Sequence, residues 1–360
     1  MYLPLSWPLL VMLGAISAGA GAAPHNLAIR GADVSTLAEL EHLGVHYQDE
    51  TRQGDLLTLM RERGLNLVRL RLWVDPRSAK GEPFGGGNND LEKVIALAQR
   101  SRALNLPWLL DLHYSDFWAD PGKQYTPRTW RGKSEAELAA MLHDYSAAVM
   151  QRLREAGVPP QMVQVGNELN NGMLWPLGQL HRQEEEEGFD RLAQLLKAAI
   201  AGIRAGSEGG ITPRLMLHLA EGGDEAQCLR WFKAMQARDV PFDLVGLSFY
   251  PYWHGSLGDL SRTMNSLATQ IRLPLLVVET PMGTIPSTRT RFAMPSVSRR
   301  PCAAGLLRRP RGNWRFSMPC VPLLPQCRIG SGSGLSTGSR AGSGSPVTAG
   351  PVRLAWRSSG

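Results

Sequence analysis

Short apolar runs alternate with longer amphipathic stretches between residues 27 and 280. The apolar runs have the length of strands and cover 27–32, 66–72, 107–112, 161–166, 213–219, 243–249 and 273–279. Helical patterns fill the intervals near 53–63, 90–104, 134–156, 189–205, 223–237 and 257–270. Asn89-Asp90 marks the second helix start, and Ser134 with Glu137 three residues later marks the third. This order predicts an α/β fold with a parallel sheet.

The number of strands favours a closed barrel over an open sheet. Seven strands in about 255 residues suit a (β/α)8 TIM barrel whose eighth βα unit is missing or scrambled in this chain. A doubly wound open sheet is the alternative, but we find no Gly-rich phosphate loop after any strand. We therefore predict one catalytic barrel over residues 24–280.

The charge of the chain changes abruptly after residue 280. Residues 281–360 contain 12 Arg and no Lys, Asp or Glu, so residues 1–280 hold 27 basic and 32 acidic residues, a net charge of −5. The net charge of +7 for the whole chain is therefore no evidence for nucleic-acid binding. We expect no nucleic-acid partner, and we interpret 281–360 as a low-complexity tail.

The first 23 residues resemble a secretory signal. A short apolar core at 8–17 precedes the small residues 18–23, although residues 1–7 carry no Lys or Arg. The stretch is too short for a comfortable membrane span. These features predict a secreted or periplasmic protein without a membrane partner. Cys228 is the only cysteine before residue 281, so we expect no disulfide in the barrel.

Two acidic residues are the strongest candidates for catalysis. Glu168 follows the run 161–166, and Glu279 closes the run 273–279. A parallel barrel gathers its strand ends around one mouth, where catalytic groups collect. Two carboxylates that face one another there are what glycosidic bond cleavage requires. Unrelated salt links are the alternative for either acid alone, but they explain the pair and its neighbours less well.

Polar and aromatic residues crowd the same end of the other strands. Arg69 and Arg71 alternate along one strand and are predicted to face the interior, where each needs a carboxylate partner. The candidates for substrate binding are Arg69, Asp111, His113, Tyr114, Asp116, Trp118, Asn167, His218, Tyr250 and Trp253. Each of them alone has a structural explanation, and only their convergence at one barrel face indicates a site.

Tryptophan residues follow several strand ends. Flat aromatic faces suit the apolar faces of sugar rings, so Trp73, Trp118, Trp175 and Trp253 are candidate sugar platforms, with core packing as the alternative. Trp108 lies within a strand and is predicted to be core. A metal site from His113, Asp116 and Asp120 matches no metal motif, so we expect no metal and no cofactor. A serine nucleophile is also not indicated, because no Gly-x-Ser-x-Gly elbow is present.

Five motifs together resemble the family 53 glycoside hydrolases. They are Gly-Ala-Asp-Val-Ser (31–35), Val-Arg-Leu-Arg-Leu-Trp-Val-Asp-Pro (68–76), Leu-Asp-Leu-His-Tyr-Ser-Asp-Phe-Trp-Ala-Asp-Pro (110–121), Val-Gly-Asn-Glu-Leu-Asn-Asn-Gly (165–172) and Leu-Ser-Phe-Tyr-Pro-Tyr-Trp-His-Gly (247–255). The resemblance covers residues 27–280. It implies a (β/α)8 barrel and a retaining endo-β-1,4-galactanase that acts on arabinogalactan type I of pectin. It also implies that Glu168 is the acid/base and Glu279 the nucleophile.

The chemistry of the residues agrees with these roles. Glu168 must be protonated to donate to the leaving oxygen, so its pKa should be raised, whereas Glu279 must be ionised. Arg69 could hold Glu279 charged, Tyr250 could orient it, and Asn167 could bind the sugar 2-hydroxyl. The alternatives are another retaining β-glycanase of the same clan and an inactive sugar-binding remnant. We expect a monomer whose only partner is its polysaccharide.

The resemblance stops after Glu279-Thr280. The family continues with a helix and an eighth strand that ends in a Tyr-Trp-Glu-Pro-type motif. Reading residues 335–342 from the third base of each codon permits Phe-Tyr-Trp-Glu-Pro-Gly-Trp, so we predict one frameshift near residues 280–283, with a genuine disordered tail as the alternative. A barrel without its eighth strand leaves strands 1 and 7 with unpaired edges, so we expect the literal chain to misfold, to aggregate or to have little activity.

Overall fold

The structure of the protein, a computed structural model, describes residues 28–49, 52–181 and 185–280. It also describes the backbone of three short strands, β10 (Leu306–Arg308), β11 (Trp314–Phe316) and β12 (Val352–Arg353). The predicted signal sequence and frameshift, and the tail apart from these strands, lie outside the described residues. Within the described helices, none is long and apolar enough to cross a membrane.

Seven parallel strands form one curved sheet in chain order. They are β1 (Gly31–Asp33), β4 (Leu67–Leu72), β5 (Trp108–Leu112), β6 (Met162–Val165), β7 (Arg214–Leu219), β8 (Leu244–Ser248) and β9 (Leu275–Glu279). Each strand pairs in parallel with the next. The arrangement is a near-closed barrel, which confirms the predicted α/β TIM-barrel class.

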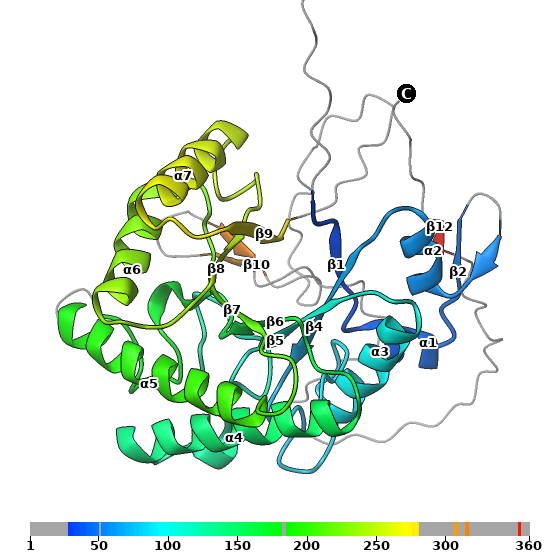
Figure 1. The fold of residues 1–360 in the computed structure, drawn as a ribbon, viewed down its shortest axis with the longest axis horizontal. Coiled ribbons are helices and arrows are strands. Elements are labelled where there is room, and N and C mark those ends of the chain that lie inside the picture. Colours follow the sequence, from blue (N-terminus) through cyan, green and yellow to red (C-terminus); the bar gives the residue numbers. More distant parts are fainter. Residues whose placement is uncertain are drawn as a thin grey trace, which may run out of the picture.

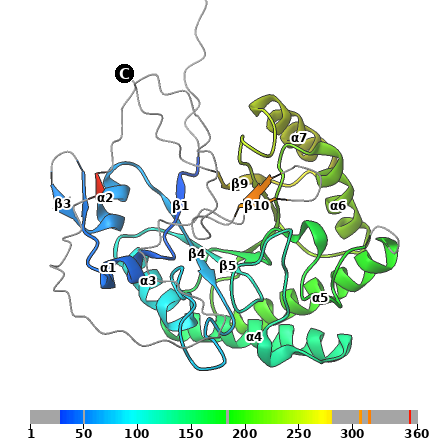
Figure 2. The ribbon, with the colours of Figure 1, turned by 180° about the vertical axis from the view of Figure 1, so that it is seen from behind.

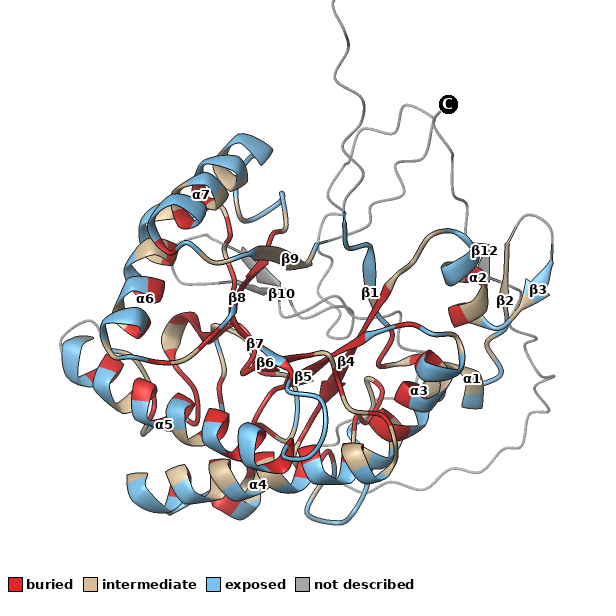
Figure 3. Ribbon diagram, viewed as in Figure 1, coloured by how far each residue is buried: buried red, intermediate tan, exposed pale blue. Residues whose placement is uncertain are grey.

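Helices cover the outside of this sheet (Figures 1 and 2). They are α1 (Leu37–His42), α2 (Leu56–Glu62), α3 (Leu91–Ala103), α4 (Glu135–Glu155), α5 (Glu185–Gly206), α6 (Glu225–Ala237) and α7 (Leu257–Gln270), with the 3₁₀ turns η1 (Arg128–Trp130) and η2 (Leu169–Asn171). Buried residues concentrate on the strands and on the helix faces turned toward them (Figure 3). Trp108 is buried in this core, as predicted.

Capping side chains fix where several helices begin. Asp90 accepts the Lys93 N–H, and Ser134 forms the predicted capping box with Glu137. The helix predicted near 53–63 is confirmed, but it begins later than predicted, because Gln53–Gly54 forms the short strand β3, which pairs with β2 (Tyr47–Gln48). The helix begins only after Asp55, whose carboxylate accepts the Thr58 N–H.

The ends of the sheet remain apart. Among the described residues, β1 pairs only with β4 and β9 pairs only with β8, so no strand joins β9 to β1. Figure 1 shows β1 and β9 at the two ends of the curve. The prediction that an eighth strand is lacking therefore agrees with the part of the chain that the structure describes.

The barrel interior changes from apolar to polar along the strands. A cluster near the strand starts contains Leu67, Leu109, Met162, Met216 and Leu244. Side chains two positions further along a strand share the same face. On four of these strands that position holds a polar residue, namely Arg69, Asp111, Gln164 and His218. The apolar layer thus forms a floor, and the polar layer above it lies toward the carboxyl ends of the strands.

Helices α4 and α5 approach one another unusually closely. Gly202 is buried on α5, and a Cβ built on it would lie 2.1 Å from the carbonyl oxygen of His143 on α4. One turn later, a Cβ on Gly206 would lie 2.3 Å from the Ala147 carbonyl oxygen. Only glycine allows this backbone contact, since a side chain would have to push the helices apart.

We predict that Gly202→Ala destabilises the protein, although Gly→Ala inside a helix ordinarily stabilises by about 1 kcal/mol. The clash with the His143 backbone should exceed that gain and lower the free energy of unfolding by about 1–3 kcal/mol in urea titrations. Gly258→Ala is the control, because a Cβ there meets nothing closer than 3.4 Å. Equal effects of the two substitutions would contradict the close packing.

Candidate active site

Glu168 lies at the carboxyl end of β6 in a left-handed backbone conformation, with φ 49° and ψ 58°. Few non-glycine residues adopt this conformation, and its cost must be offset by surrounding contacts. Gln124 supplies two of them, because its Nε2 donates to the carbonyl oxygens of Asn167 (2.7 Å) and Glu168 (3.1 Å). This backbone turns the buried Glu168 side chain into the mouth of the barrel.

Glu279 ends β9 next to the β8 residue that contacts Glu168. Ser248 pairs with Glu279 in the β8–β9 ladder, and its hydroxyl donates to Glu168 Oε1 at 2.7 Å. The two carboxyl groups therefore lie at the same end of the barrel, with Ser248 between their strands. Tyr250 donates its hydroxyl to Glu279 Oε2 at 2.9 Å.

Arg69 occupies the centre of this polar layer. Its guanidinium contacts carboxylates from three strands: Asp33 at 3.1 Å, Asp111 at 2.8 Å and Glu279 at 2.9 Å. The side chain is almost completely buried. Burial alone would lower the pKa of Arg69, but the three acids outweigh burial and raise it. The predicted orientation of Arg69 and its need for carboxylates are confirmed by these contacts.

Gln164 connects the charged groups to the neutral ones. Its Oε1 accepts from Arg69 Nη2 at 3.1 Å. Its Nε2 lies 2.6 Å from Asp111 Oδ1 and 3.0 Å from Asn167 Oδ1. Asn167 is itself fully buried and donates through Nδ2 to the Ala119 carbonyl oxygen. The amides of Gln164 and Asn167 thus fix the orientation of Arg69 without adding charge.

His218 supports Glu168 through Ser248. His218 Nε2 lies 2.9 Å from Ser248 Oγ, and the Glu168 N–H points to His218 Nδ1 at 3.3 Å. Because the Ser248 hydroxyl donates to Glu168, its oxygen accepts the His218 Nε2 proton, and Nδ1 is left to accept. Burial lowers the pKa of His218 to about 4, so the ring is neutral at physiological pH.

The balance of buried charge shifts the pKa values of Glu168 and Glu279 in opposite directions. Two guanidinium groups, Arg69 and Arg71, already face the carboxylates of Asp33, Asp111 and Glu279. A further negative charge on Glu168 would be buried with no cation left over for it. Burial first, and then the charge of Glu279, raise the pKa of Glu168 well above its ordinary value. Burial also opposes ionisation of Glu279, but the charge of Arg69 holds its pKa below the ordinary value.

Asp111 and His113 form a closed pair beside Arg69. His113 Nδ1 accepts the Ala119 N–H at 3.1 Å, so its Nε2 donates to Asp111 at 2.9 Å. Burial favours the neutral acid, but Arg69 and His113 hold the pKa of Asp111 below its ordinary value. Both ring nitrogens of His113 are engaged, which leaves none for a metal. No group of acidic, histidine or cysteine residues suited to a metal occurs in the described part of the chain.

Two of the predicted substrate-binding residues serve the scaffold. Tyr114 is fully buried, and its hydroxyl lies 2.8 Å from Ser146 Oγ on α4, so its prediction as a substrate contact is wrong. The Tyr114 side chain reaches α4 on the outside of the barrel, and its backbone has a positive φ of 50°. Asp116 accepts the N–H groups of Asp75 and Arg128, so both of its oxygens tie loops together.

The candidate sugar platforms divide in the same way. Trp73 has an exposed fraction of 0%, because Phe117 and Trp118 cover its ring, so its prediction as a platform is wrong. Trp118 is half-buried, with Arg71 Cζ 3.9 Å from the centre of its ring. Trp253 is 44% exposed and contacts the ring of Tyr250, the residue that bonds to Glu279.

Sequence reasoning missed Gln124, Gln164, Ser248 and Asp33 as parts of the site. Gln164 and Ser248 carried a signal, since each interrupts an apolar strand at an inward position. Asp33 directly follows the predicted strand 27–32 and ends the observed strand β1. Gln124 lies in a loop and contacts a segment more than forty residues away, so no local pattern could have identified it.

The family 53 glycosyl hydrolase profile matches residues 29–290 of the chain. The chain belongs to this family. Its predicted resemblance to family 53 is confirmed, and the protein is a glycoside hydrolase by descent.

Three relatives illustrate the similarity. An uncharacterised protein from the bgaB 5′ region of Niallia circulans is 40% identical over 255 residues, which are 70% of this chain and 67% of that protein. The endo-β-1,4-galactanase of Bacillus subtilis (strain 168) is 33% identical over 253 residues, 70% of this chain but 56% of the relative. A solved fungal β-1,4-galactanase is 32% identical with a TM-score of 0.64, over 71% of this chain and 74% of that one. The chain thus spans between about half and two thirds of the two sequence relatives.

We predict opposite stability effects for Glu168→Gln and Glu279→Gln. A raised pKa means that the unfolded chain ionises Glu168 first as pH rises, so the native protein loses stability from about pH 4.3 upward. The loss is about 1.4 kcal/mol for each pH unit that separates the pKa of Glu168 in the folded protein from that in the unfolded chain. Glu168→Gln removes this loss and should be more stable than the native protein at pH 8, with the difference shrinking toward pH 4. Its amide oxygen can still accept from Ser248.

Glu279→Gln should behave in the reverse sense. A lowered pKa contributes stability above about pH 4.3, so the variant should be less stable at pH 8, and the difference should shrink as pH falls through the lowered pKa. Urea unfolding of both variants at pH 4, 6 and 8 measures these differences. A Glu168→Gln variant that is less stable than the native protein at pH 8 would show that Glu168 is not held neutral.

Proposed function

We propose that the protein is a secreted, retaining endo-β-1,4-galactanase that cleaves the galactan chains of arabinogalactan type I. The observation that carries this proposal is the opposite electrostatic environment of Glu168 and Glu279 at one barrel mouth. One acid favours its protonated form and the other its ionised form, as a retaining glycosidase requires. The names of the galactanase relatives support the substrate.

The first half of the reaction uses the two glutamates in their resting states. The Glu279 carboxylate attacks the anomeric carbon while Glu168 transfers its proton to the glycosidic oxygen, so that the C–O bond breaks and the leaving sugar departs neutral. Arg69 and Tyr250 hold Glu279 in place through its two oxygens. We assign the remaining amide hydrogen of Asn167 to the 2-hydroxyl of the sugar.

The second half of the reaction reverses the roles. Glu168, now ionised, takes a proton from water, and the water oxygen attacks the anomeric carbon and releases Glu279. Two inversions give net retention. A retaining pair, in which one carboxylate is the nucleophile, requires about 5–5.5 Å between the two carboxyl groups. An inverting pair requires about 6.5–9.5 Å, which leaves room for a water molecule.

Secretion follows in this proposal from residues 1–23, whose apolar core and small residues resemble a cleaved signal. An extended extracellular polysaccharide is a substrate that a secreted enzyme meets directly. The enzyme acts as a monomer, with the glycan as its only partner.

We predict that Glu279→Ala lowers galactan hydrolysis by on the order of 10³-fold or more, because no group remains to attack the anomeric carbon. Added azide should restore turnover and yield the α-galactosyl azide, since one inversion replaces two. Proton NMR of the native reaction should show β-configured products first. Glu82→Ala, an exposed loop acid, is the control and should retain native activity.

Three results would change the proposal. Near-native activity of Glu279→Ala would exclude this nucleophile. Products from another β-linked glycan but not from galactan would identify a different glycanase of the same clan. Binding of galactan without any products would identify a sugar-binding protein without activity.

We predict that Ser248→Ala shifts the alkaline limb of the kcat/KM profile on galactan to higher pH. This limb reports ionisation of the acid in the free enzyme. The hydrogen bond from Ser248 lowers the pKa of Glu168, so its removal should raise that pKa further. Ser101→Ala is the control, because this buried hydroxyl bonds only to its own helix at Leu97. A shift to lower pH would contradict the assignment of Glu168 as the acid.

A further inference from the structure

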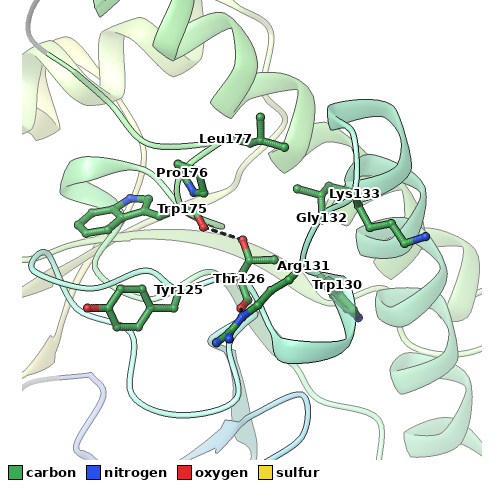
Figure 4. Close-up of a pocket in the computed structure, with 10 residues that line it drawn as sticks. Tyr125, Thr126, Trp130, Arg131, Gly132, Lys133, Trp175, Pro176 and Leu177 are labelled. Atoms are coloured by element: carbon green, nitrogen blue, oxygen red, sulfur yellow. Dashed lines mark hydrogen bonds between the residues drawn. The ribbon is translucent and has the colours of Figure 1, made fainter.

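A cavity lies outside the Glu168–Glu279 site. It has a volume of about 320 Å³, within the range of about 300–1,000 Å³ typical of ligand sites. Figure 4 shows it between the loop that follows β5 and the loop that follows β6. Neither catalytic glutamate lines it. Its lining residues are Tyr125, Thr126, Trp130, Arg131, Gly132, Lys133, Leu138, Trp175, Pro176 and Leu177.

One side of the cavity is an aromatic pair held by backbone contacts. The rings of Tyr125 and Trp175 lie 6.5 Å apart at 84°, and Tyr125 is 61% exposed. Thr126 Oγ1 donates to the Trp175 carbonyl oxygen at 2.9 Å. Trp175 also donates its Nε1 proton to the Asn171 carbonyl oxygen at 2.9 Å. The Trp175 ring is therefore positioned before any ligand arrives, and both rings offer flat apolar faces.

The charged side chains that line the cavity are all cationic. None of its lining residues is acidic. Lys133 pairs with Glu137 at 3.3 Å, and Figure 4 shows its side chain turned away from the rings. Arg131 donates its Nε to the Thr126 carbonyl oxygen at a long 3.4 Å, and within the described residues it has no carboxylate partner. Its guanidinium can therefore bind a carboxylate of a ligand by donating two parallel hydrogen bonds, the bidentate geometry that arginine favours.

The cavity is joined to the catalytic site through one residue. The carbonyl oxygen of Gln124 accepts the Trp175 N–H at 2.7 Å, while its side chain holds the backbone of Glu168. A ligand seated on the Tyr125–Trp175 pair therefore lies on the loops that frame the acid/base. A polysaccharide that crosses the barrel mouth could place a neighbouring residue there.

We propose that this cavity binds a uronic acid residue, with its ring against Tyr125 and Trp175 and its carboxylate on Arg131. The inference rests on the proposed function in that it takes the substrate to be a polysaccharide. It adds that the enzyme prefers glycans in which carboxylated sugars lie near the neutral chain to be cut.

Isothermal titration calorimetry with trigalacturonate as the probe tests this site. The unaltered chain should bind trigalacturonate more tightly than the neutral trisaccharide galactotriose, and the affinity should fall as salt rises. Arg131→Gln should weaken trigalacturonate binding by about tenfold or more, because a charge-assisted pair is lost. Arg204→Gln is the matched control, since it removes an exposed arginine of α5 that does not line the cavity, and it should change affinity less than about twofold.

Equal trigalacturonate affinity of Arg131→Gln and the unaltered chain would overturn the proposal. Equal affinity of the unaltered chain for trigalacturonate and for galactotriose would overturn it as well. Circular dichroism confirms that each variant is folded, and Tyr125→Ala gives a second variant that should also lose affinity. The proposed function fails separately, because its readout is the appearance of products from neutral galactan. Uronate binding without galactan products would leave this site standing and remove the galactanase assignment.

Discussion

The ion pairs of one buried arginine organise the upper layer of this barrel. Arg69 draws Asp33, Asp111 and Glu279 from three separate strands toward one guanidinium. A buried cation without such partners would be prohibitively costly, and each acid would be equally unfavourable without the cation. The requirement is therefore mutual, and it fixes β1, β4, β5 and β9 relative to one another at the mouth.

The same constraint decides the protonation of the two glutamates. Once the guanidinium groups are satisfied by Asp33, Asp111 and Glu279, no positive charge remains for Glu168. Its environment is instead made of neutral groups, the Ser248 hydroxyl and the neutral His218 ring behind it. One acid that favours its protonated form and one that favours its ionised form thus arise from two identical side chains by the position of one arginine.

The edges of the sheet are the exception to this closed network. β9 carries Glu279 yet pairs on one side only among the described residues, and β1 carries Asp33 in the same condition. Arg69 therefore connects the two unpaired ends of the sheet across the mouth. Full closure of a barrel would fix both acids through backbone pairing as well. Among the described residues, the two edges of the sheet are linked by these side-chain ion pairs.

The sequence by itself determined the order of strands and helices, because alternating apolar and polar positions fix which face of an element is buried. It also indicated Arg69, Glu168 and Glu279, because they are polar residues at or near strand ends. Only the tertiary structure decided which neighbours meet them. Tyr114 and Trp73 lie beside residues of the barrel mouth in the sequence but are themselves buried in the core. Gln124 and Ser248 come from a distant loop and strand to hold Glu168. Local periodicity reports the face of an element, whereas contacts between elements depend on the register and curvature of the whole barrel.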